Sequence, residues 1–144
     1  MWLNFKVMPM LLKFITGHAI FCVVFVMSAI PGGTFKINGQ VVSHSEWWSS
    51  GAGPFALVLG ILMPITGVLL LQKSRYARPA YIAVASLALV LPYLFMGQLV
   101  SAFIGFVVVG LLALYLYFRR TVLHYFASNH AFNSDGPAFG GPAS

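Results

Sequence analysis

The chain has 144 residues, of which 60% are hydrophobic and only 7% are charged, whereas soluble domains carry about 25% charged residues. This composition excludes an ordinary soluble domain and predicts an integral membrane protein. The formal net charge is +6, but the cations lie between apolar runs and form no basic face, so we expect no nucleic-acid partner.

The first apolar run predicts a membrane span over residues 10–30, after an interfacial segment that carries Lys6 and Lys13. A spanning helix needs about 20 apolar residues because of the thickness of the hydrocarbon core. The run ends in a Pro-Gly-Gly sequence at residues 31–33. A cleaved signal peptide is the competing interpretation, because basic residues precede an apolar stretch that ends in small residues.

Residues 31–53 form the one sizeable loop between the apolar runs. An Asn-Gly pair at residues 38–39 lies between two stretches rich in β-branched residues, and this pair favours a type I′ turn. The loop is therefore expected to contain a short β-hairpin. Its register pairs Phe35 with Val42 and Ile37 with Gln40.

A short interfacial helix is predicted directly after the hairpin. Ser43 and Glu46 have the spacing of a capping box, in which the serine oxygen accepts from a helix N–H and the glutamate reaches back. The helix then carries Trp47 and Trp48 to the membrane surface. Paired tryptophans before a span are typical interfacial anchors, and contact with a partner protein is the alternative.

The second span is predicted over residues 54–71. Small residues at intervals of three and four share one of its faces, which lets helix backbones approach closely in lipid. The face is composed of Gly53, Ala56, Gly60, Pro64 and Gly67. The proline should kink the helix, so the face is interpreted either as a packing seam or as a hinge that opens a substrate site.

Residues 79–118 are almost uncharged and would extend about 60 Å as one helix, so they must fold back. The turn is expected at residues 96–98, which gives spans over residues 79–95 and 99–118. A second stripe of small residues crosses this corner and comprises Gly97, Ser101 and Gly105.

The chain beyond the fourth span divides into two segments. Residues 121–127 are expected to continue the helix into the interface, with Leu123, Tyr125 and Phe126 lying on lipid. Residues 128–144 are rich in Gly, Pro, Ser and Asn and are expected to be a flexible cytoplasmic tail. The membrane domain is therefore assigned to residues 1–127.

The distribution of cations predicts the orientation. Of the eight Lys and Arg residues, all but Lys36 fall on one side of the predicted spans, with the largest groups being Lys73, Arg75, Arg78, Arg119 and Arg120. The positive-inside rule places that side in the cytoplasm. The predicted fold is an all-α bundle of four transmembrane helices in a bacterial inner membrane. Both termini are cytoplasmic, and the β-hairpin and interfacial helix lie outside between the first two spans.

His18 is the ionisable side chain deepest inside a predicted span, and Cys22 follows one helical turn later on the same face. An ionisable group at that depth is a functional candidate because its placement there is costly. His18 and Cys22 are therefore candidate ligand-binding residues, and the ligand expected for the His18 imidazole is haem or a quinone. Two ligands are too few for a tetrahedral metal site, so no metal site is predicted. The alternative is a neutral histidine that is hydrogen-bonded to a neighbouring helix.

The scarcity of acids excludes more functions than the motifs suggest. The acids are Glu46 and Asp135, and neither lies in a span, so ion coupling through a buried carboxylate is excluded. No catalytic residues and no bound cofactor are predicted. We expect a non-catalytic accessory or assembly subunit that packs through its small-residue faces against lipid and other membrane subunits, or against copies of itself. The alternatives are an uncoupled pore or carrier with a kinked second helix, and a redox- or lipid-linked enzyme subunit that uses His18.

Overall fold

The computed structural model describes residues 2–27, 35–37 and 39–127. The predicted tail over 128–144 and the start of the outer loop lie outside these residues. The described elements, in chain order, are α1 (Trp2–Val7), α2 (Met10–Phe21), α3 (Val24–Met27), β1 (Phe35–Ile37), β2 (Gln40–Val42), α4 (His44–Ser49), α5 (Ala52–Leu71), α6 (Ala77–Leu89), α7 (Leu91–Phe95), α8 (Leu99–Phe118) and α9 (Arg120–Ala127).

Four helical segments are long and apolar enough to cross a membrane, as the sequence predicts. They are Met10–Met27, Ala52–Leu71, Ala77–Phe95 and Leu99–Phe118. The protein is therefore a mostly helical integral membrane protein. The β1–β2 hairpin has the predicted register, with Phe35 paired to Val42 and Ile37 to Gln40.

Two of the four segments are interrupted, although the sequence predicted continuous spans over residues 10–30 and 79–95. Between α2 and α3, the Val23 N–H donates to the Ile20 carbonyl and the Phe25 N–H to the Cys22 carbonyl, so this turn is tighter than an α-helix. The break between α6 and α7 lies at Val90, two residues before Pro92. Proline cannot donate to the preceding turn and its ring crowds that turn's carbonyl.

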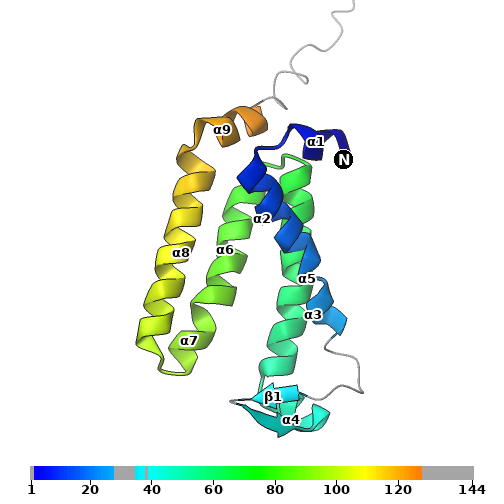
Figure 1. The fold of residues 1–144 in the computed structure, drawn as a ribbon, viewed down its shortest axis with the longest axis vertical. Coiled ribbons are helices and arrows are strands. Elements are labelled where there is room, and N and C mark those ends of the chain that lie inside the picture. Colours follow the sequence, from blue (N-terminus) through cyan, green and yellow to red (C-terminus); the bar gives the residue numbers. More distant parts are fainter. Residues whose placement is uncertain (1, 28–34, 38, 128–144) are drawn as a thin grey trace, which may run out of the picture.

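The four segments form a row rather than a ring of equal neighbours. The segment of α5 packs against α2 and α3 on one side and against α6 on the other, and α6 packs in turn against α8. Figure 1 shows that α1 and α9 lie across one end of the long helices, at the top of the view, while the β-hairpin, α4 and α7 lie at the opposite end. We call these the packed end and the open end.

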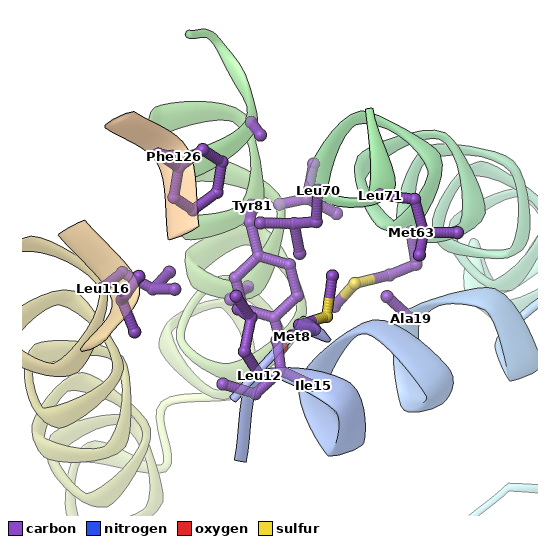
Figure 2. Packing of buried hydrophobic residues seen from close by; sticks show 14 of the residues in the cluster. Met8, Leu12, Ile15, Ala19, Met63, Leu70, Leu71, Tyr81, Leu116 and Phe126 are labelled. Carbon is purple, nitrogen blue, oxygen red and sulfur yellow. The ribbon is translucent and has the colours of Figure 1, made fainter. Parts of the chain in front are cut away.

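The names reflect where side chains are buried. At the packed end, a single apolar cluster draws on both halves of the chain and includes Met8, Leu12, Leu70, Tyr81, Leu116 and Phe126 (Figure 2). At the open end, every residue from Tyr93 to Val100 is exposed. Within the described residues, the helices are thus tied together mainly near α1 and α9.

Two side chains from distant segments cap the end of α5. The Asn4 side-chain amide donates to the Leu71 carbonyl at 3.0 Å, and the Tyr125 hydroxyl donates to the Leu70 carbonyl at 3.3 Å. The last carbonyls of a helix have no partner within the helix and need one elsewhere. These bonds therefore fix α1 and α9 to the same helix end.

The position of α9 corrects the expectation that it lies on lipid. Tyr125 and Phe126 are only 5% and 8% exposed and belong to the buried cluster, while Leu123 remains 39% exposed. The chain turns at Arg119, whose backbone is extended. This turn directs α9 across the ends of the long helices. An apolar helix face fits lipid or protein equally well, so the amphipathic pattern could not distinguish the two.

Candidate functional site

His18 and Cys22 lie on one turn of the first segment but face different surroundings. The Cys22 Sγ lies 3.9 Å from the His18 Nε2. Cys22 is buried in the apolar cluster, whereas His18 is exposed. No group of three metal-ligating side chains occurs among the described residues. The pair therefore offers a single outward imidazole rather than an enclosed ligand site.

His18 lies among exposed residues on one side of α2. Phe14 is 75% exposed and Phe21 70% exposed. Between them, a Cβ added to Gly17 would meet no atom within 4 Å. We call the surface formed by Phe14, Gly17, His18 and Phe21 the α2 outer face. It places one polar ring and one small residue among phenyl groups.

The small-residue face of α5 is occupied by the chain itself. A Cβ added to Gly53 would lie 2.9 Å from the Trp47 ring, and one at Gly60 would lie 2.8 Å from the backbone nitrogen of Val26. One at Gly67 would lie 2.9 Å from the Ile20 side chain. The three glycines thus seat α4, α3 and α2 in turn. Ala56 and Pro64 are half-buried, and α5 is a continuous helix through the proline.

The three residues of the second small-residue stripe, Gly97, Ser101 and Gly105, have different roles. A Cβ added to Gly105 would lie 2.0 Å from the Leu89 carbonyl oxygen, so α6 and α8 are in backbone contact there. Ser101 lines a shallow groove of about 300 Å³ beside Gly105 and Tyr93. Gly97 instead forms the predicted turn, with φ of +68° and open space around it.

Ser43 and Glu46 form the predicted capping box of α4. The Glu46 backbone N–H donates to Ser43 Oγ at 3.2 Å, and the Ser43 N–H donates to the Glu46 carboxylate at 2.8 Å. The Ser43 hydroxyl also donates to this carboxylate at 2.8 Å. These bonds favour the charged form and lower the pKa of Glu46 below its usual range. These bonds account for Glu46 as a residue that caps the start of α4.

The tryptophans of α4 hold the hairpin against α5. Trp47 is buried, stacks on Phe35 with ring centres 4.5 Å apart, and packs against Gly53. The Trp48 indole N–H donates to the His44 Nε2 at 2.9 Å. Trp47 is therefore an internal contact rather than a free anchor, whereas Trp48 is half-buried and retains an outward surface.

A basic groove of about 390 Å³ lies at the packed end, where the α5–α6 connection meets α8 and α9. Its lining contains three cations together with aromatic and apolar side chains, namely Lys73, Ser74, Arg75, Arg78, Pro79, Tyr117, Leu123, Phe126 and Ala127. Arg119 and Arg120 are exposed near the start of α9 and are not among the lining residues.

The cations of the groove are positioned by aromatic rings. The Lys73 ammonium lies 4.8 Å from the Tyr125 ring centre, and the Arg78 guanidinium lies 4.2 Å from that of Phe126. Arg75 lies over the ring of its neighbour Tyr76. The sequence predicts these cations only as determinants of topology. The available signal was the aromatic residues at positions 125 and 126, but their position opposite the α5–α6 connection depends on the turn at Arg119.

Comparison of the chain with protein-family models, with curated proteins and with solved structures finds no match.

Proposed function

We propose that the protein is a non-catalytic membrane subunit that binds a helix of another membrane subunit, or of a second copy, on its α2 outer face. The observation that carries this proposal is the exposure of His18 near the middle of the Met10–Met27 segment. Apart from the Cys22 sulfur at 3.9 Å, an imidazole facing hydrocarbon lacks the partners that water would supply, and this is unfavourable. A neighbouring helix with a hydrogen-bonding group would satisfy the imidazole.

The shape of the α2 outer face suits a helix. Gly17 leaves open space between the exposed Phe14 and Phe21 rings. Small residues of this kind let two helix backbones approach closely, which is how helices associate in lipid. The small-residue face of α5 already seats α2, α3 and α4 of the same chain. The proposed contact therefore uses α2 rather than the α5 face that the sequence suggested.

The proposed orientation places the packed end on the cytoplasmic side of a bacterial inner membrane. Seven of the eight Lys and Arg residues lie in α1, in the start of α2, between α5 and the first turn of α6, or where α8 meets α9. The eighth, Lys36, lies in β1. The positive-inside rule supports this orientation. The hairpin and α4 would then lie outside, and both chain ends would face the cytoplasm.

The two alternative functions draw less support from the same geometry. An uncoupled pore would need α5 to part at its proline, but the helix runs unbroken from Ala52 to Leu71. A redox role for His18 would need further groups around the imidazole. The Cys22 Sγ lies 3.9 Å from the imidazole, and Cys22 itself is buried. A subunit interface requires neither feature.

Site-specific photo-crosslinking in native membranes tests the proposal. A crosslinking side chain at Phe21, on the α2 outer face, should give a protein adduct of defined mass. The matched position is Phe106 on α8, which is similarly exposed at 66%, and it should give lipid adducts. Protein adducts from Phe106 alone, or from neither position, would contradict the proposed face.

The variant His18→Leu tests the role of the imidazole. Interhelical hydrogen bonds in membranes contribute about 0.6 kcal/mol, so the complex should weaken about threefold. The variant should fold normally, because His18 is exposed and its contact among the described residues is the 3.9 Å approach of its Nε2 to the Cys22 Sγ. An unchanged yield of the Phe21 adduct in this variant would remove His18 from the interface.

A further inference from the structure

We propose that the basic groove at the packed end binds the phosphate of an anionic lipid. The proposal concerns a ligand site, and it is independent of the α2 outer face. Three observations carry it: the convergence of cations on one groove, the fixing of those cations by aromatic rings, and the backbone conformation of Lys73.

The convergence of charge is the first observation. Lys73 and Arg75 come from the α5–α6 connection and Arg78 from the first turn of α6, and all three line the groove. Among the described residues the single acidic side chain is Glu46, which lies in α4 at the opposite end of α5. The groove therefore has a positive potential that favours an anion.

The aromatic contacts are the second observation. Arg78 lies over Phe126 at 4.2 Å and within 6.0 Å of the Tyr117 ring centre. An arginine held over a ring loses less conformational freedom when its N–H groups bind an oxygen. Guanidinium groups match phosphate oxygens in geometry and charge. Arg78 is thus suited to bind a phosphate without rearrangement.

The backbone of Lys73 is the third observation. Its φ is +54°, and it is the one non-glycine residue with positive φ among those described. The Ser74 N–H donates to the Leu69 carbonyl and the Lys73 N–H to the Leu70 carbonyl, which is the Schellman arrangement at a helix end. Glycine is preferred at this position, and a lysine there is strained. Strain kept at such a position points to a use for the side chain.

The position of the groove favours a lipid as the source of the phosphate. The groove lies where the segment Ala77–Phe95 begins and the segment Leu99–Phe118 ends, at the level expected for headgroups. Pro79 and Leu123 supply apolar surface beside the cations. A headgroup in the groove could leave its acyl chains along the exposed side of α8, where Phe118 is 74% exposed.

The test is native mass spectrometry of the purified full chain in detergent, titrated with phosphatidylglycerol and, separately, with zwitterionic phosphatidylcholine. Phosphatidylglycerol should bind more tightly. The variant Lys73→Gly should weaken its binding about fivefold, because a cation near the headgroup layer contributes about that factor. Its thermal stability should stay the same or rise, because glycine adopts this backbone conformation without strain.

The matched control is Arg120→Gln, which removes the same charge from the packed end outside the groove and should leave the affinity unchanged. Equal weakening by both variants would show attraction by net charge alone and overturn the site. Equal binding of the two lipids would overturn it as well. An excess of inorganic phosphate should not displace the lipid. Full displacement would assign the groove to a free anion and overturn the lipid as its ligand.

Discussion

At the packed end, side chains from α2, α5, α6, α8 and α9 meet in one buried cluster, and two distant residues bond to the last carbonyls of α5. At the open end, the residues from Tyr93 to Val100 are exposed, and the backbones of α6 and α8 come into direct contact at Gly105. Contacts within the chain therefore hold the packed end of the helices, whereas more of the open end is left exposed.

Disruption of the α6–α8 contact is expected to cause the largest loss in the free energy of unfolding. The variant Gly105→Val would force a Cβ against the Leu89 carbonyl oxygen, 2.0 Å away. Backbone cannot move aside as a side chain can, so we expect a loss of about 3 kcal/mol in the free energy of unfolding. Thermal unfolding in detergent, followed by tryptophan emission, measures this loss.

The matched variant for this contact is Gly110→Val on the same helix. A Cβ there would meet no atom within 4 Å. Its effect should stay within about 0.5 kcal/mol. Equal effects of the two variants would mean that the helix tolerates a β-branched residue equally at both sites, and the close contact at the open end would be refuted.

At the packed end, Tyr125→Phe should have a smaller effect. The variant removes the hydroxyl that donates to the Leu70 carbonyl, and loss of one such bond costs about 1 kcal/mol. The control is Tyr117→Phe, since Tyr117 is 43% exposed and its change should leave thermal stability unaltered. A neutral Tyr125→Phe variant would show that α9 is held by apolar contacts alone.

The same tyrosine predicts an alkaline transition. Burial raises the pKa of Tyr125 to about 12, so the folded chain holds this proton more tightly than the unfolded chain does. Stability is therefore unaffected below the ordinary tyrosine pKa of about 10 and falls as the pH rises from there towards about 12. Urea unfolding at a series of alkaline pH values should show this fall in the wild type and less of it in Tyr125→Phe.

At the open end, acid should loosen α4 locally, which is the smallest expected effect. The pKa of Glu46 is lowered by its bonds to Ser43, so its contribution is present above the ordinary glutamate pKa of about 4.3. It is lost as the pH falls from there through the lowered value. Amide hydrogen exchange of α4, corrected for the pH dependence of the intrinsic exchange rate, should show less protection in that range. Glu46→Gln, which keeps every other titratable group, should lack this acid step.

Local signals in the sequence were enough to predict much of this fold. The apolar runs predicted the four long segments, the Asn-Gly pair predicted the register of the hairpin, and the spacing of Ser43 and Glu46 predicted the capping box. Each of these depends on neighbours within a few positions along the chain.

Features that depend on distant contacts were not predicted. The first apolar run gave no signal that His18 faces outward, because a spanning helix is apolar on every side. The packing of Tyr125 and Phe126 depends on the turn at Arg119, and the basic groove depends on that packing. The α5 glycines were identified as a seam, but which helices they seat became evident only in three dimensions.

The most direct test of the proposed subunit role is the mass of the particle that contains this 15.7 kDa chain when it is extracted gently from its native membrane. Blue-native electrophoresis followed by mass spectrometry gives that mass and the identity of any companion. We predict a larger particle that contains a second membrane subunit or a second copy, and a smaller proportion of it for His18→Leu. A chain that migrates alone, with no companion after crosslinking, would contradict the account.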